Sequence, residues 1–350
     1  MKKSDSAVRI RIIVTPNFNM AATMGFVDPF RAANYLEGIT HFSWEFVSEH
    51  GGACMASNGV AIPTTSIASA PAGDPDFLIV SSSWTPESYG TPAVLAMLRQ
   101  AVRRPTIIGG IDTGAFIVAE AGLLTGRQAT VHYEHIDAFQ ELYPETDVSD
   151  DLVVFDGNRI SCCGGAASFD FALHILTSIQ GTALANSAAR YVFHQTLRQP
   201  GSPQNPQDAE PLGQSVPKAV RVAIKAMEAN LEEPVQISEI CKKAKISHRQ
   251  LDRLFSLHIK KSPALYYRDI RLDRARGLVT QTTMSMAEIA FASGFSSQVH
   301  FSRAYKGRFG LPPIQDRIEG RIPFEFRAWP MHRMPSNRKY GQEEKKKGAP

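Results

Sequence analysis

The residues of this sequence best suited to chemistry surround Asp112, within residues 107–116 (IIGGIDTGAF). This stretch reads as a strand, a sharp glycine turn and a helix, the arrangement that presents a reactive side chain in many α/β enzymes. A carboxylate at that turn can act as a nucleophile in some hydrolases, or it can cap the first turn of the helix. Binding a ligand is a third role open to Asp112.

Further polar and aromatic side chains are expected beside Asp112, because pockets of parallel sheets form outside the carboxyl ends of their strands. Trp84 and Tyr133 could enclose a quaternary ammonium group by cation–π attraction, with Asp112 or Glu134 as counter-charge. Taken singly, Trp84 could instead cover the core, and His132 could be a hydrogen-bonded strand residue. We expect a ligand site without metal or cofactor, lined by Phe18, Ser82, Ser83, Trp84, Asp112, His132, Tyr133 and Glu134.

A second group of residues is suited to contact with DNA. Residues 285–288 have the hydroxyl and carboxylate spacing of a capping box that starts a helix, and Gly294 supplies a tight turn to the next helix. That second helix has Phe301 and Tyr305 on one side and hydrogen-bond donors on the other. This combination is typical of a helix-turn-helix, whose second helix enters the major groove of DNA.

The same pattern occurs twice, which indicates the architecture better than one match would. Residues 237–240 correspond to residues 286–289, and residues 251–255 correspond to residues 301–305. Between the copies, residues 265–279 read as one amphipathic helix that would join the two units rigidly. The sequence therefore predicts an all-α domain with two helix-turn-helix motifs.

Charge is segregated along the chain. Residues 1–216 carry 12 Lys and Arg against 21 Asp and Glu, a formal charge of −9, whereas residues 217–317 carry 18 against 9, a charge of +9. A basic block confined to the helix-turn-helix region indicates a polyanionic partner, since an ordinary solvated surface would not be segregated in this way.

Strands and helices alternate in the first part of the chain, which predicts an α/β fold with a flavodoxin-like parallel sheet. Four regions follow from the patterns: an α/β domain at 8–197, a Pro-, Gln- and Gly-rich linker at 198–216, the all-α domain at 217–317, and a basic, disordered tail at 318–350. Strands are expected at 8–14, 44–48, 76–80, 106–109, 130–133, 152–155 and 159–160, and helices at 24–37, 94–103, 113–121, 167–180 and 183–197.

The compartment follows from what the sequence lacks. The 4 cysteines show no zinc-ligand spacing, and no secretory signal follows Met1. No apolar run approaches the about 20 residues that a membrane span requires. We expect a reduced, cytoplasmic protein without membrane contact.

Residues 217–317 resemble the DNA-binding domain of the AraC/XylS family of bacterial transcription regulators. The resemblance depends on residues 287–290, 294–295, 301–303, 309–310 and 312–313. It implies that the two recognition helices contact DNA with Arg249, Asp252 and Arg253, and with Gln298, Val299, His300, Arg303 and Lys306. Arginine suits bidentate contact with guanine and glutamine suits adenine, whereas Val299 could touch a thymine methyl or make no contact. Lys245 stands where the first turn of the family usually has glycine.

Residues 8–195 resemble the class I glutamine amidotransferase-like (ThiJ/PfpI) family, mainly through residues 107–116, 119–124 and 130–132. More narrowly, they are similar to the AraC-type regulators that carry such a domain at the N-terminus. Enzymes of the family have a cysteine at the turn, activated by a nearby histidine. His132 matches that histidine, but Asp112 replaces the cysteine and cannot do thiol chemistry. The resemblance therefore implies a non-catalytic sensor, with a ThiJ/PfpI-type hydrolase or amidase carrying an accessory helical domain as the alternative.

The resemblance also implies partners. We expect a sequence-specific transcription regulator, an activator of a catabolic operon that works with RNA polymerase at promoter DNA. Its effector is expected to be a small nitrogenous metabolite of the betaine, carnitine or amino-acid type, and the acidic domain is expected to form a homodimer.

Overall fold

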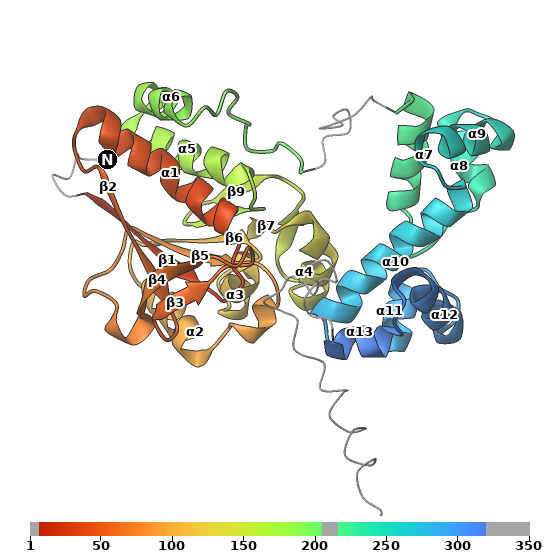
Figure 1. Cartoon of the computed structure of the whole chain (residues 1–350), viewed down its shortest axis with the longest axis horizontal. Helices are drawn as coiled ribbons and strands as arrows, with labels where there is room; N and C mark the ends of the chain where they lie inside the picture. Colours follow the sequence, from red (N-terminus) through yellow and green to blue (C-terminus); the bar gives the residue numbers. More distant parts are fainter. Residues whose placement is uncertain (1–6, 205–215, 320–350) are drawn as a thin grey trace, which may run out of the picture.

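The structure is a computed structural model that describes residues 7–204 and 216–319. Figure 1 shows a sheet domain followed by a helical region. The main sheet has the order β3-β4-β2-β1-β5-β6-β10-β9, and β7 and β8 form a separate pair. The strands are β1 (Val8–Val14), β2 (Phe42–Ser48), β3 (Gly52–Met55), β4 (Ala61–Ser66), β5 (Phe77–Ser82), β6 (Ile107–Asp112), β7 (Gln128–Thr130), β8 (Asp147–Ser149), β9 (Val153–Asp156) and β10 (Arg159–Cys162).

The central strands confirm the flavodoxin-like prediction. β2, β1, β5, β6 and β10 are parallel, and the strand order reverses between β1 and β5. In such sheets, the crevice at the carboxyl ends of the strands where the order reverses is the usual ligand position. β3 and β9 are antiparallel to their neighbours at the two edges of the sheet.

Helices cover both faces of this sheet, so β1 is buried on both sides (Figure 1). Ile12 contributes to the core under α1, α5 and α6, whereas Ile13 contributes to the core under α2 and α3, as the alternation of a strand requires. The helices are α1 (Met20–Glu37), α2 (Pro92–Ala101), α3 (Gly114–Glu120), α4 (Ile136–Leu142), α5 (Ala167–Gln180) and α6 (Thr182–Tyr191), with short 3-10 turns η1 (Ile67–Ser69), η2 (Pro86–Ser88) and η3 (Tyr133–His135).

Two of the predicted elements of this domain are wrong in part. The strand predicted at 130–133 ends at Thr130, because the His132 ring accepts a hydrogen bond from the Glu134 backbone and the chain turns into η3. The helix predicted at 183–197 ends at Tyr191. The Asp170 carboxylate then holds Arg198 at 2.5 Å and turns the chain back onto α5. The sequence also missed β3, β4 and β8, which are short and lack a buried apolar face.

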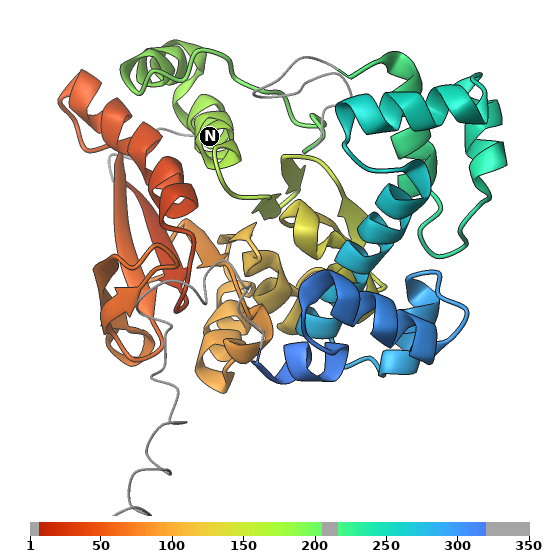
Figure 2. The same ribbon diagram turned by 45° about the vertical axis from the view of Figure 1, so that its right-hand side comes forward.

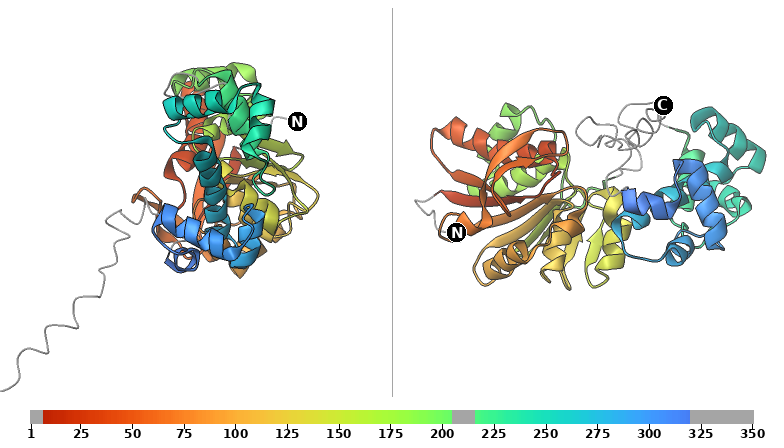
Figure 3. Two further views of the ribbon diagram at one scale, coloured as in Figure 1. Left: turned by 90° about the vertical axis from the view of Figure 1, so that its right-hand side faces the viewer. Right: turned by 60° about the horizontal axis from the view of Figure 1, so that its bottom comes forward.

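The helical region confirms the two predicted helix-turn-helix units. One core joins α7, α8, α9 and the start of α10, and a second joins the rest of α10 with α11 and α12. Figures 2 and 3 show the two helix pairs at opposite ends of α10. The helices are α7 (Lys218–Glu228), α8 (Ile237–Ala244), α9 (His248–His258), α10 (Pro263–Gln281), α11 (Met286–Ala292), α12 (Gln298–Phe309) and α13 (Pro313–Glu319).

The ends of these helices follow local chemistry. The predicted capping box is present: the Ser285 hydroxyl accepts from the Glu288 N–H, and the Glu288 carboxylate accepts from the Ser285 N–H. Lys245, in place of the usual glycine, ends α8 with φ 55° and ψ 41°. It therefore keeps the turn, at a backbone cost of about 1–2 kcal/mol.

Two predicted regions lie partly outside the described residues. The linker prediction falls there for residues 205–215, and the tail prediction for residues 320–350. The described start of the linker contacts the sheet domain, since Gln204 donates to the Val131 carbonyl at 2.8 Å. Within the described part of the chain, no helix combines the length and the apolar character needed to cross a bilayer.

Gly294 gives a stability test for the second helix-turn-helix. Its φ is 72°, and a Cβ there would lie 2.5 Å from the Leu231 carbonyl oxygen and from Pro234. We expect Gly294→Ala to lower the free energy of unfolding by more than about 1 kcal/mol, because left-handed backbone and close contact both oppose a side chain. Urea unfolding measures the change. Gly307→Ala is the control: a Cβ there meets nothing within 4 Å, so the helix should gain about 0.5–1 kcal/mol.

Candidate functional site

Two helices present the side chains predicted to contact DNA. α9 begins at a capping box made by Ser247 and Gln250, and α12 begins where the Ser297 hydroxyl accepts from the His300 N–H. Each helix buries one side in its core, so its opposite side faces solvent. The buried side chains are Leu251, Phe255, Phe301 and Tyr305. The solvent-facing sides hold Arg249, Asp252, Arg253, Gln298, Val299, His300, Arg303 and Lys306.

Several exposed donors on these helices have no partner among the described residues. Within residues 7–204 and 216–319, no hydrogen bond or ion pair engages the side chains of Arg253, Arg303 or Lys306. Asp252 differs, because its carboxylate pairs with the His248 ring at 2.9 Å. Val299 is 66% exposed and places an apolar side chain among the donors.

Other arginines of the helical region are held in structural pairs. Arg308 contacts Asp273 at 2.6 Å, and Arg276 contacts the fully buried Asp316 at 3.0 Å. Arg271 lies over the Phe295 ring at 4.9 Å and donates to the Gly294 carbonyl. These three arginines are therefore engaged inside the protein, whereas Arg253, Arg303 and Lys306 remain available to a polyanion.

Asp112 occupies the turn between β6 and α3 with φ 61°, the geometry of an elbow. It is only 3% exposed, and the Asn19 amide donates to its carboxylate at 3.1 Å. Burial raises the pKa of Asp112 to about 6, and nearby His132 opposes part of that shift. The capping role is not adopted, because Thr113 is the N-cap residue of α3.

The other residues predicted at the rim separate into two layers. Phe18 is fully buried in the core, and Ser82 and Ser83 are buried under the rim with Asp112. Tyr133 is half exposed, and its hydroxyl donates to the exposed Glu134 carboxylate at 3.3 Å. The His132 ring contacts the Tyr133 ring at a tilt of 33°, with centroids 4.6 Å apart, and His132 lies between the buried and the exposed layer.

The exposed layer opens into a cavity of about 870 Å³ between the sheet domain and the helical region. The sequence did not predict this cavity, because its second wall comes from α10, far along the chain. One signal was present in the sequence: a glycine, Gly277, stands inside the helix predicted at 265–279. A Cβ on Gly277 would lie 3.6 Å from the Glu134 carbonyl oxygen, so α10 passes close to the rim.

The two parts of the chain also contact each other directly beside this cavity. α10 packs against α4 and η3, as Figure 1 shows at the lower end of α10. Arg274 of α10 lies 3.4 Å from the Asp137 carboxylate of α4. His135 is buried near Gln281, and burial together with His132 lowers its pKa to about 3. The junction therefore contains a neutral imidazole and one ion pair.

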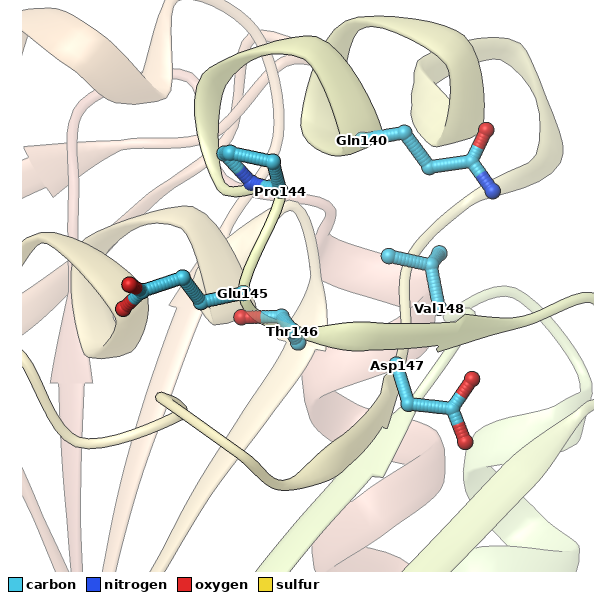
Figure 4. A pocket seen from close by; sticks show the side chains of 6 residues that line it. All are labelled: Gln140, Pro144, Glu145, Thr146, Asp147 and Val148. Carbon is cyan, nitrogen blue, oxygen red and sulfur yellow. The ribbon is translucent and has the colours of Figure 1, made fainter.

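Two further features lie in this part of the sheet domain. His132, Glu134 and His135 bring ligand atoms within 4.8 Å of one another. The Nδ1 atom of His132 already accepts a hydrogen bond from the Glu134 backbone, and Glu134 accepts one from Tyr133. A depression of about 500 Å³, shown in Figure 4, contains none of the predicted ligand residues. It is lined by Gln140, Pro144, Glu145, Thr146, Asp147 and Val148.

Both parts of the chain match known protein families. Residues 8–178 match the DJ-1/PfpI family, and residues 240–318 match a helix-turn-helix domain family. The chain is 38% identical to the HTH-type transcriptional regulator CdhR of Pseudomonas aeruginosa, over 87% of this chain and 90% of that protein. It is 32% identical to the HTH-type transcriptional regulator GlxA of Rhizobium meliloti, over 89% of this chain and 95% of that protein.

A solved structure supports the fold of the sheet domain. A ThiJ/PfpI family protein from Pseudomonas syringae superimposes with a TM-score of 0.50 at 22% identity, over 68% of this chain and 89% of that chain. The two regulators match most of this chain, including parts of both domains. The chain therefore belongs to the AraC-type helix-turn-helix transcriptional regulators that carry an N-terminal DJ-1/PfpI domain.

Proposed function

We propose that this DNA-binding regulator reads promoter DNA with α9 and α12 and changes that binding when a small nitrogenous metabolite occupies its sheet domain. One observation carries the DNA part of the proposal. The exposed donors on the two recognition helices have no partner within the described residues, while neighbouring arginines of the same region are paired. Unpaired cations on two helices joined by a third suit a regularly spaced polyanion.

The two recognition helices would enter successive major grooves on one face of DNA, about 34 Å apart. α10 supports this arrangement, because it contributes side chains to the cores of both units. Arg253 and Arg303 would read guanine, Gln298 would read adenine, and Lys306 would contact phosphate. Arg249, Asp252, Val299 and His300 would complete the contact surface.

The regulatory setting is proposed from the family. The protein would activate a catabolic operon by working with RNA polymerase, and it would act as a homodimer formed through the acidic domain. An exposed apolar group on that domain supports dimer formation. Tyr35 is 67% exposed and Phe193 is 88% exposed, and the Tyr35 and Tyr191 rings lie 5.2 Å apart. Contiguous exposed apolar patches on a soluble protein often mark a site of contact with another protein.

We propose that the sheet domain senses and does not catalyse. Asp112 lies at the position of a nucleophile, but its carboxylate is buried and held by Asn19. The alternative, a hydrolase or amidase with an accessory helical domain, predicts turnover. A gel shift on DNA upstream of the gene, performed beside amidase and glyoxalase assays, separates the two. Turnover without a gel shift would establish the alternative.

Calorimetric titration tests the ligand-binding residues. We expect glycine betaine, L-carnitine or L-arginine to bind, and Asp112→Ala and Trp84→Ala each to weaken that binding. Loss of the Trp84 ring removes a cation–π contact of about 0.5–2 kcal/mol, which corresponds to roughly 2- to 30-fold in affinity. Unchanged affinity in both variants would remove this site from the proposal.

A further inference from the structure

The cavity between the domains has walls from both parts of the chain. Trp84, Tyr133 and Glu134 come from the sheet domain, and Glu228, Gly277 and further residues come from the helical region. Its volume of about 870 Å³ suits a small metabolite, since ligand pockets of proteins span about 300–1,000 Å³. Any molecule that fills it touches the surface around the elbow and the helix that joins the two DNA-binding units.

Carboxylates predominate among the charged groups that line the cavity. Six carboxylates and two guanidinium groups are present: Glu87, Glu134, Asp137, Asp150, Glu228 and Asp273, with Arg274 and Arg276. Both arginines are already paired, Arg274 with Asp137 and Arg276 with the buried Asp316, and Asp273 pairs with Arg308, which lies outside the cavity lining. The remaining field is negative, which favours a cation and opposes an anion.

Glu228 and Asp150 account for much of this excess. Within the described parts of the chain, neither carboxylate takes part in a hydrogen bond or an ion pair. Glu228 is exposed at the cavity wall, and the protein atoms around it raise its pKa by partial desolvation. A cation that reached Glu228 would replace that lost solvation, while Trp84 and Tyr133 supply aromatic surface from the other wall.

We propose that the effector is a small organic cation or zwitterion that binds in this cavity, bridging the sheet domain and the helical region. The inference rests on the proposed effector-dependent function, and it adds a second wall to the site. Because α10 carries both helix-turn-helix units, the ligand stabilises one placement of those units relative to the sheet domain. Linkage then requires that promoter DNA change the affinity for the ligand by the same factor as the ligand changes the affinity for DNA.

The test uses the full-length protein and two variants on the helical wall. Glu228→Gln removes one carboxylate without breaking any bond of the described protein, and Gly277→Leu projects a side chain into the cavity from α10. Glycine betaine, L-carnitine and L-arginine are titrated calorimetrically, with succinate as an anionic probe. Matched controls are Glu233→Gln, an exposed carboxylate outside the cavity, and Ala264→Leu, an exposed position on the same helix.

We expect at least one cationic or zwitterionic probe to bind and succinate not to bind. Glu228→Gln should lower the affinity for that probe by about fivefold, which corresponds to the loss of one partly exposed ion pair. Gly277→Leu should lower the affinity by more than about tenfold, because the leucine side chain fills part of the cavity that the ligand would occupy. Both controls should bind the probe like the parent protein, and circular dichroism should show that all four variants are folded.

Two results would overturn the inference. If Trp84→Ala abolishes binding while Glu228→Gln and Gly277→Leu leave it unchanged, the ligand contacts the sheet domain alone. The proposed function then stands without the bridging site. If no cationic or zwitterionic probe binds at millimolar concentration, or succinate binds better, the ligand class is wrong. A probe that binds through both walls but does not alter the gel shift would retain the site and remove the proposed effector function.

Discussion

Arg253→Ala and Arg303→Ala are each expected to weaken binding to the cognate promoter by about 1–3 kcal/mol and to relax base preference at one position. Both side chains are exposed on recognition helices, and neither is used in an ion pair within the described residues. Their removal should therefore delete the proposed contact to DNA without disturbing the fold. Fluorescence anisotropy on cognate and single-base-substituted duplexes measures the loss.

Two matched variants separate base reading from general attraction. Lys306→Ala should lower the affinity for cognate and random DNA alike. It should also reduce the slope of log affinity against log salt concentration by about one unit, as expected for the loss of one phosphate contact. Arg308→Ala should act on stability instead, because Arg308 is bound to Asp273 and Asp269. If Arg253→Ala and Arg303→Ala reduce the binding free energy for cognate and random DNA equally, these arginines do not read bases.

Asp112→Asn is expected to stabilise the sheet domain at neutral and alkaline pH by about 2–3 kcal/mol. The buried carboxyl has a pKa of about 6, against an ordinary value of 3.8. Between these two values the folded state keeps a proton that the unfolded state has lost. Stability therefore falls as pH rises from about 4 to about 6, and stays lower above pH 6.

The amide variant removes that ionisation. It should match the parent protein below pH 4 and exceed it above pH 6, when unfolding by urea is followed at each pH. Asparagine also tolerates the left-handed backbone at this position, where φ is 61°. Asp74→Asn, the same substitution at a carboxylate on the protein surface beside Arg104, is the control and should not raise the stability at pH 8. Equal stability of parent and Asp112→Asn at pH 8 would show that burial does not penalise this carboxylate.

The elbow retains its geometry although its residue type has changed. Gly114 and Gly164 leave room around it: a Cβ on Gly164 would lie 2.9 Å from the Asp112 Cβ, and a Cβ on Gly114 would lie 2.0 Å from the Val80 carbonyl oxygen. The close packing places the Asp112 carboxylate below the surface. The side chains that remain accessible, Tyr133 and Glu134, are the ones that face α10.

The sequence by itself determined the features that depend on local chain geometry. The capping boxes and Gly294 set where the helices begin and turn, and the helical period then decides which side chains of α9 and α12 share a face. Each of these signals acts over a few residues only. The parallel, flavodoxin-like sheet followed from the alternation of strands and helices and from the resemblance. The segregation of charge was also visible from the sequence, because counting charged residues along the chain needs no coordinates.

Only the tertiary structure decided which polar groups are free and which cavity is shared. Arg276 and Arg303 look alike in sequence, but Arg276 is bound to Asp316, forty residues away, and Arg303 is not paired within the described residues. Phe18 and Tyr133 both belonged to the predicted rim, yet one is buried in the core and the other faces α10. These outcomes depend on contacts between distant segments, and no local pattern encodes the packing of α10 against η3.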